Sequence, residues 1–138
     1  MAILDYGSAV RMFADDGTLD ANLDGPLLTG ARVALEGVGV ELYTLAGSNP
    51  YDRNMGVARP LPGLVNFSGG DAELHRIEAD YVVAARKVAN VITARFAFQR
   101  IARGLVLTGA ITTADGIVSP LVATVTDAIK VLFPTVPA

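Results

Sequence analysis

Hydrophobic residues recur at spacings of three and four in two stretches, which is the spacing of one helix face. The first stretch predicts a helix from about Leu27 to Ala46, with Gly47 as its stop signal. The second predicts a helix from Ala72 to about Lys87, with Asp71 as an N-cap candidate. The apolar positions are Ala31, Ala34, Leu35, Val38, Leu42 and Leu45 in the first helix and Leu74, Ile77, Tyr81, Val82 and Ala85 in the second.

Two glycines interrupt the first of these helices. Gly37 and Gly39 each cost about 1 kcal/mol relative to alanine in a helix interior. A helix that carries both needs packing to hold it, and the missing side chains let another backbone come close. We therefore expect this helix to make the closest contact with the sheet or with a neighbouring subunit.

Beyond residue 88 the hydrophobic period becomes two, which is typical of half-buried strands. Strands are predicted at Ile92–Gln99, Leu105–Thr112 and Ile117–Val125, with a hairpin turn signal at Ala114–Gly116. Pro120 lacks an N–H, so the third strand is expected at an edge or to contain a bulge. The segment Thr126–Phe133 fits either a short helix or a fourth strand.

The N-terminal part reads as a short strand, Val10–Phe13, a turn that ends at Gly17, and an acidic loop closed by Pro26. The 138 residues fit one domain. We expect an N-terminal strand and acidic loop over 1–26, a helical part over 27–87 and a β part over 88–133. The predicted fold class is α+β, with two main helices packed on one face of a small antiparallel sheet and a C-terminal Asp-Gly hairpin.

The composition is apolar for a domain of this size, with 51% hydrophobic residues and a mean hydropathy of +0.43. The least charged stretch, Gly104–Thr126, contains Asp115 and Pro120 and lacks the roughly 20 apolar residues of a spanning helix. We therefore expect a subunit that hides surface against partners, not a membrane protein. The start of the chain lacks a basic region, so no signal peptide is expected. Without cysteine, the chain has no disulfide or thiol chemistry.

The net charge of −3 is unevenly spread. Residues 1–41 carry seven acidic residues and two arginines, while residues 86–103 carry five basic residues and no acidic one. Opposite patches suit head-to-tail contacts or two different neighbours, and the alternative is a pair of solvated faces. The basic run includes Phe96 and Phe98, an interleaving that also occurs in nucleic-acid platforms. Both phenylalanines occupy the alternate strand positions that are expected to face the core, so no nucleic-acid partner is expected.

The sharpest metal signal is Asp20-Ala-Asn-Leu-Asp-Gly25, which matches the first six positions of a calcium loop. Position twelve is Ala31, where the loop needs a glutamate, and no clear helix precedes Asp20. An acidic turn is the simpler interpretation. Gly37-Val-Gly39 lies within a helical pattern and is not a dinucleotide fingerprint. We expect no metal site and no cofactor.

Catalytic chemistry has little support in the residue pattern. Four glutamates, Glu36, Glu41, Glu73 and Glu78, raise the question of a carboxylate pair for glycoside hydrolysis. All lie on predicted helices, where we expect them to be solvated. His75 is the only histidine, and no serine has a nucleophile-elbow sequence. The chain is therefore not expected to be an enzyme.

One stretch, Leu42–Gly56, holds a helix end, a glycine break and a polar Tyr-Asp-Arg loop. This order, followed by a second helix and an Asp-Gly hairpin, resembles the sheath-initiator, wedge-associated family of contractile phage tail baseplates. Relatives occur in type VI secretion baseplates. The family loop carries a Glu-Pro-Arg-like motif, and this chain has Asn49-Pro-Tyr-Asp-Arg53, without the glutamate and with altered spacing. The matching residues are Thr44, Gly47, Tyr51, Asp52, Gly56, Asp115 and Gly116.

The resemblance implies a structural subunit that links the tube and wedge to the first sheath ring. It implies that sheath assembly is templated by β-augmentation, the addition of a sheath strand to this sheet. The implied partners are the tail sheath protein and the baseplate wedge and hub or tube proteins. Six copies would ring the tube in the virion, after assembly in the host cytoplasm. The implied contact residues are the loop residues Tyr51, Asp52 and Arg53, and Pro120, Leu121 and Val122 on a presumed edge strand.

The competing interpretation is a small α+β enzyme or ligand-binding domain, such as a cell-wall hydrolase-like or calcium-binding module. Both interpretations use the same fold class. Solution behaviour would separate them, because a baseplate subunit made alone should associate.

Overall fold

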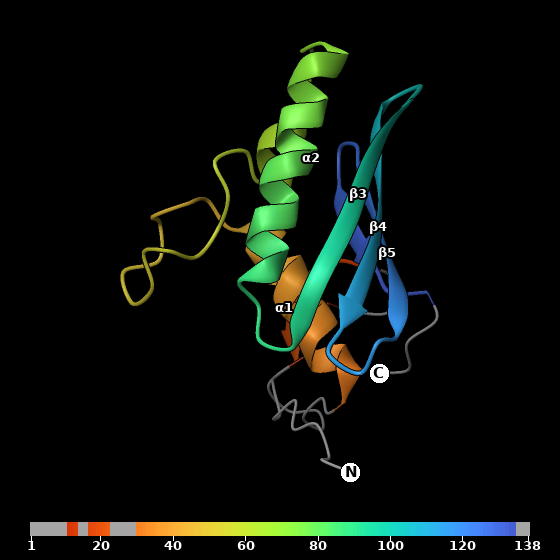
Figure 1. Ribbon diagram of the computed structural model, residues 1–138. Coiled ribbons are helices and arrows are strands. Elements are labelled where there is room, and N and C mark those ends of the chain that lie inside the picture. Colours follow the sequence, from red (N-terminus) through yellow and green to blue (C-terminus); the bar gives the residue numbers. More distant parts are fainter. Residues whose placement is uncertain (1–10, 14–16, 23–29, 135–138) are drawn as a thin grey trace.

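The computed structural model describes residues 11–13, 17–22 and 30–134 (Figure 1). It confirms the predicted α+β class, with a four-stranded antiparallel sheet in the order β3-β4-β5-β6 and a separate two-stranded hairpin, β1-β2. In chain order the elements are β1 (Arg11–Phe13), β2 (Leu19–Asn22), α1 (Ala31–Tyr43), a short 3-10 helix η1 (Leu61–Leu64), α2 (Asp71–Arg86), β3 (Val91–Ile101), β4 (Gly104–Thr113), β5 (Val118–Val125) and β6 (Ile129–Leu132).

The core lies between the two helices and one face of the large sheet. Alternate residues of β4 and β5, such as Leu107, Ile111 and Leu121, are fully buried there. The helices contribute the stripes that their sequence periodicity predicts, including Leu35 and Tyr81. Tyr81 packs against the rings of Phe96 and Phe98, so α2 covers β3 (Figure 1). No helix in the described part of the chain combines the length and apolar character needed to cross a membrane.

Helix α1 ends at Tyr43, three residues before the predicted end. Thr44 leaves the helical conformation, with φ −102° and ψ 132°, because Leu45 forms a parallel bridge with Val57. Leu45 is consequently 52% exposed and does not belong to the buried stripe. The predicted start at Leu27 lies outside the described residues.

The glycines of α1 permit close packing, as expected, but against side chains and not against the sheet backbone. A Cβ at Gly39 would lie 2.7 Å from Cε2 of Phe13, and one at Gly37 would lie 2.9 Å from Cγ1 of Val88. The helix therefore packs tightly against β1 on one side and against the end of the α2 segment on the other.

One local expectation in α2 is wrong, and the start of β3 departs from strict alternation. Asp71 is the first residue of α2 and does not cap it, because the N-cap position belongs to Gly70, which makes no side-chain bond. In β3 the register shifts between Val91 and Thr93. The resulting irregularity turns Ile92 outward, where it is 53% exposed, and Val91 takes the inward place.

The expectation that the β5 region is an open edge is also wrong. The ambiguous segment after Thr126 folds back as β6, whose residues Ile129–Leu132 pair with Val122–Val125. The true edge on the other side is β3. Leu121 is fully buried in the core, whereas Pro120 and Val122 are half-buried on the opposite face.

The register of β5 explains how the sheet accommodates Pro120. The Thr113 N–H donates to the Ile117 carbonyl at 3.1 Å, and hydrogen-bonded pairs alternate along an antiparallel ladder. The pair Ala110–Pro120 is therefore a non-hydrogen-bonded one, and the missing N–H faces away from β4. It falls beyond the last β6 pair, Val122–Leu132, so the proline removes no ladder bond.

The predicted acidic loop contains strand β2, which the sequence pattern did not indicate. Leu19–Asn22 pairs antiparallel with β1, so the first residues of the calcium-like motif are extended. No helix precedes Asp20 within the described residues, and positions 23–25 of the motif lie outside them. In the described part of the chain, no three His, Cys, Asp or Glu side chains are grouped so that they could hold a metal ion.

Candidate functional site

The segment 46–56 forms a loop that projects from the body of the protein (Figure 1). Its two ends are joined by backbone hydrogen bonds, from Ala46 N–H to the Val57 carbonyl at 2.8 Å and from Val57 N–H to the Thr44 carbonyl at 2.9 Å. Gly56 N–H donates to Oε2 of Glu41 on α1 at 2.7 Å. A loop whose ends meet in this way is an Ω-type loop, a form that often carries function.

Gly56 is required at the base of this loop. Its φ is +101°, a region that side chains other than glycine avoid. A Cβ would lie 2.6 Å from the Thr44 carbonyl oxygen, so the two loop ends could not approach. Glycine at position 56 thus has a conformational and a steric reason in this chain.

Side-chain hydrogen bonds give the loop a defined shape. Oδ1 of Asn49 accepts the Tyr51 N–H at 2.9 Å, and Oδ1 of Asp52 accepts the Asn54 N–H at 3.1 Å. Lys87, at the end of α2, donates from Nζ to the Asn54 carbonyl at 2.7 Å. The two Asx turns and the Lys87 bond order the loop before any partner binds.

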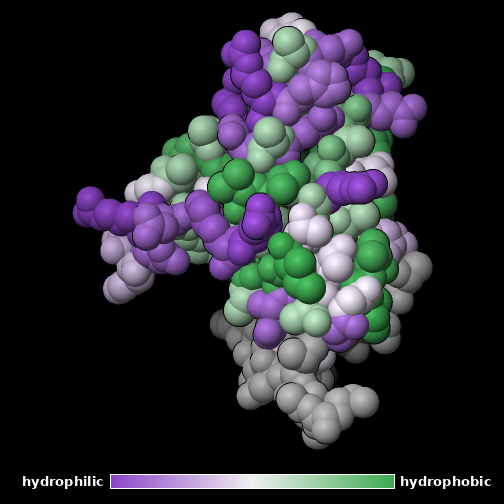
Figure 2. Space-filling model, in the orientation of Figure 1, coloured by the Kyte–Doolittle hydropathy of each residue, from purple (hydrophilic) through white to green (hydrophobic). Residues whose placement is uncertain are grey.

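The structure brings Tyr51, Asp52 and Arg53 together at the exposed part of this loop. Tyr51 is 97% exposed, and its two neighbours are also exposed. Figure 2 shows the loop as a hydrophilic arm. An aromatic ring held out on an ordered loop is suited to anchoring a protein partner, because little conformational entropy remains to be lost.

Three helix glutamates are wrongly predicted to be solvated. Glu36 and Glu41 are buried, and the side chain of Glu78 is only 15% exposed. Each accepts a backbone N–H from a distant segment: Phe13 N–H to Glu36 at 3.5 Å, Gly56 N–H to Glu41 at 2.7 Å and Phe98 N–H to Glu78 at 2.7 Å. These carboxylates thus connect the helices to the N-terminal hairpin, to the loop and to the sheet.

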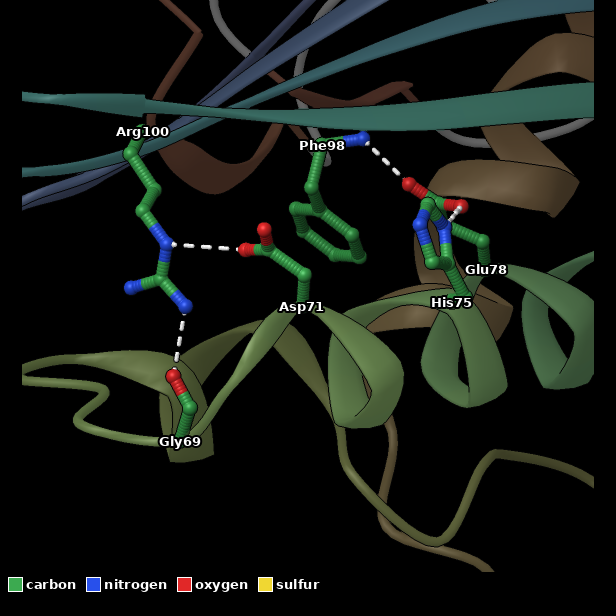
Figure 3. A network of polar contacts seen from close by, with 6 residues as sticks. All are labelled: Gly69, Asp71, His75, Glu78, Phe98 and Arg100. Atoms are coloured by element: carbon green, nitrogen blue, oxygen red, sulfur yellow. Dashed lines mark hydrogen bonds and ion pairs between the residues drawn. The ribbon is translucent and has the colours of Figure 1, made fainter.

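The bond to Phe98 identifies the outward groups of the β3 edge (Figure 3). Because this N–H donates to Glu78 and not to β4, alternation places the N–H and C=O groups of Ala94 and Phe96 on the same outer side. Further along the edge, Arg100 pairs with Asp71 at 3.3 Å and donates to the Gly69 carbonyl at 2.5 Å. The start of α2 therefore closes the edge near residues 98–100.

An open groove of about 610 Å³ runs along the remaining β3 edge, between α2 and the sheet. The side chains that form its walls are mostly small or apolar, and the polar residues Glu78 and His75 are also part of them. The groove is lined by His75, Glu78, Ala79, Val82, Ala94, Arg95, Phe96, Ala97, Thr108, Gly109 and Ala110. Its shape admits an extended chain that could add to β3.

Two titratable side chains around α2 have shifted pKa values. Oε1 of Glu78 lies 2.9 Å from Nδ1 of His75, and this hydrogen bond, with the carboxylate charge, raises the pKa of His75 above its ordinary 6.5. Burial raises the pKa of the Tyr81 phenol, whose hydroxyl donates to the Arg59 carbonyl at 2.8 Å. Tyr81 consequently stays neutral at ordinary pH and serves as a packing residue.

The two predicted contact regions lie apart. The loop projects from the α2 side of the molecule, whereas β5 lies within the sheet, beyond β3 and β4 (Figure 1). Sequence reasoning missed the β3 edge groove, since nothing in a linear pattern says which strand ends a sheet. The only local signal was the row of small residues at Ala94, Ala97 and Gly109.

No protein-family model, curated protein or solved structure matches this chain.

Proposed function

We propose that this chain is a structural subunit of a contractile phage tail baseplate, linking the tube and wedge to the first sheath ring. The observation that carries the proposal is the loop 46–56, closed at its base and exposing Tyr51 almost completely. It stands where the resembled family carries its docking motif. The α+β fold, with two helices on one face of an antiparallel sheet, is the fold that the resemblance implied.

In this proposal the loop docks on a wedge or hub protein. Tyr51 provides apolar contact area, and Arg53 provides a forked donor for a partner carboxylate. Because the loop is already ordered by Asn49, Asp52 and Lys87, docking loses little conformational entropy. Six copies would surround the tube in the virion.

We propose that the sheath contact is on β3 and not on β5. The β5 strand is covered by β6 over Val122–Val125, whereas β3 ends the sheet and is bordered by the groove. A sheath strand would bond to the outward groups of Ala94 and Phe96 and would stop at Glu78, which occupies the Phe98 N–H. Sheath assembly would then be templated from this edge.

The proposal assigns no catalytic role to the glutamates. Glu36, Glu41 and Glu78 are engaged with backbone N–H groups of other segments and hold the fold together. A structural role explains their burial without an enzymatic reaction.

The test is incorporation of loop variants into assembled baseplates. Arg53→Ala and Tyr51→Ala should leave the purified chain folded, because both side chains are exposed, but should block or strongly reduce incorporation. Arg76→Ala, which removes an exposed arginine from α2, is the matched control. Incorporation of both loop variants at the level of the control would refute the docking role.

A further inference from the structure

A second groove lies beside α1 and has a cavity volume of about 390 Å³. Its walls are largely apolar and come from four parts of the chain. Met12 belongs to β1, Val33 and Val40 to α1, Met55 to the loop, and Val88 to the connection after α2. The groove therefore forms only when these segments pack together.

Carboxylates supply the only charges among the described residues that line this groove. Glu41 and Asp52 are among them, together with Glu36, whose carboxylate is held by the Phe13 N–H and lies 3.6 Å from Arg32. No lysine, arginine or histidine belongs to the described part of the lining. The nearby Lys87 ammonium donates to the Asn54 carbonyl in the loop. Apolar walls lower the local dielectric constant, so they focus the negative potential of the acids.

Glu41 has capacity for a further donor. The residue is 8% exposed, and Oε2 already accepts the Gly56 N–H. Oε1 accepts no hydrogen bond from the described residues, and Asp52 uses only Oδ1, toward the Asn54 N–H. Oε1 is therefore open to a donor, and a cationic group in this largely apolar groove would form a charge-assisted hydrogen bond with it.

We propose that this groove binds an arginine side chain presented by a partner protein. The aliphatic stem would lie along Val33, Val40 and Met55, and the guanidinium would donate to Glu41 and Asp52. A forked donor suits two carboxylates better than a single ammonium does. Because Asp52 belongs to the loop, the bound arginine would extend the contact surface of Tyr51. The inference goes beyond the baseplate proposal and does not depend on which protein supplies the arginine.

Methionine methyl groups offer a direct readout, because the chain has three methionines and two of them, Met12 and Met55, line the groove. The full chain would be labelled with [¹³C-methyl]methionine and titrated with N-acetyl-L-arginine N-methylamide. Met12→Leu and Met55→Leu assign the signals. The same titration with the citrulline analogue, a neutral isostere, separates charge from shape. We expect saturable shifts of Met12 and Met55 with the arginine probe, weakened by salt, and little response to citrulline.

Charge-removing variants complete the test. Glu41→Gln keeps an acceptor for Gly56 N–H, and Asp52→Asn keeps one for Asn54 N–H, so the fold should persist. Each should weaken arginine binding by about five- to tenfold, the order expected for one charge-assisted hydrogen bond. Asp127→Asn, at the exposed turn before β6, should have no effect. Equal binding of citrulline, equal weakening by Asp127→Asn, or unmoved Met12 and Met55 signals would overturn the proposal. Tighter binding of N-acetyl-L-lysine N-methylamide, titrated in the same way, would overturn the choice of arginine.

Discussion

At the scale of single residues, the most consequential side chains are glutamates that bond to backbone N–H groups. Glu78 joins α2 to the β3 edge, and Glu41 joins α1 to the base of the loop. A hydrogen bond to a charged group contributes about 1.5–3 kcal/mol, and its loss leaves a donor unsatisfied. These bonds thus set the relative positions of segments that local sequence does not connect.

We expect Glu78→Ala to lower the free energy of unfolding by about 1–3 kcal/mol, because the Phe98 N–H would lose its acceptor. Glu78→Gln should cost less, since the amide oxygen can still accept. Urea denaturation measures both, and Asp80→Ala, which changes an exposed acid on α2, is the control. Equal stability of Glu78→Ala and the control would contradict a clamping role.

The pair His75–Glu78 predicts a small pH dependence of stability. The pKa of His75 is raised in the folded state, so the native state binds the histidine proton more tightly than the unfolded state does. The stabilisation is fully present below the ordinary pKa of 6.5 and is lost as pH rises through the folded pKa. Comparing urea midpoints of the wild type and His75→Gln across this range tests it. A difference between them that does not shrink on going to high pH would speak against the pair.

Gly56→Ala should open the base of the loop, because the added Cβ meets the Thr44 carbonyl oxygen and the φ of +101° is strained. We expect a loss of about 2 kcal/mol or more in stability, together with fast exchange of the Val57 amide. Gly47→Ala is the matched control, with φ +77° but nothing within 4 Å of the new Cβ. If the two variants are destabilised equally, the steric argument fails.

At the scale of elements, one edge region of the four-stranded sheet is covered, and the other edge is partly open to a further strand. β6 returns along β5, and β1-β2 lies beside β6, where the Gly17 carbonyl accepts the Val131 N–H at 2.7 Å. At the other edge, within the described part of the chain, α2 lies next to β3, and the bonds of Glu78 and Arg100 close part of this edge. A partial closure of this kind limits uncontrolled edge pairing while keeping a short stretch open.

Hydrogen exchange should distinguish the two sides of the sheet. The amides of Val122 and Thr124 face β6 and should exchange slowly in the isolated chain. The amides of Ala94 and Phe96 face outward and should exchange faster, then become slow in the assembled tail. If Val122 and Thr124 are protected only on assembly, β6 does not form in the free chain. If Ala94 and Phe96 gain no protection, the proposed sheath contact at the β3 edge is wrong.

At the scale of the whole molecule, the loop and the β3 edge present two separate surfaces on a 138-residue chain. Large apolar residues are also exposed at one end of the sheet, where Ile92, Ile117 and Val118 lie. Figure 2 shows hydrophobic side chains gathered over the lower half of the described surface. Several contact surfaces on one small domain suit a part that joins different neighbours.

The purified chain should not hydrolyse peptidoglycan. Its buried glutamates are bonded to backbone N–H groups, and among the described residues His75 pairs with Glu78. Release of soluble fragments from purified cell walls measures the activity. Cleavage that is abolished by changing one glutamate to glutamine, in a variant that remains folded, would overturn the structural assignment.

Local pattern alone determined a large part of this fold. Hydrophobic spacing predicted both helices and the three long strands, because burying one face imposes a period of 3.6 or 2 on the sequence. The Tyr51–Arg53 loop was also foreseeable, since a glycine break and a polar run end a helix wherever it lies. The ends of the elements were less predictable. Helix α1 ends early because Leu45 meets Val57, a contact between residues twelve positions apart.

Only the tertiary structure decided which groups are buried and which edge is open. Glu36, Glu41 and Glu78 looked like solvated helix residues, but each meets an N–H from a segment at least 15 positions away. Leu121 is a core residue and β3 is the free edge, because strand order depends on how β6 folds back. The sequence encodes these long-range pairings through the combined packing of all elements, so no local window reveals them.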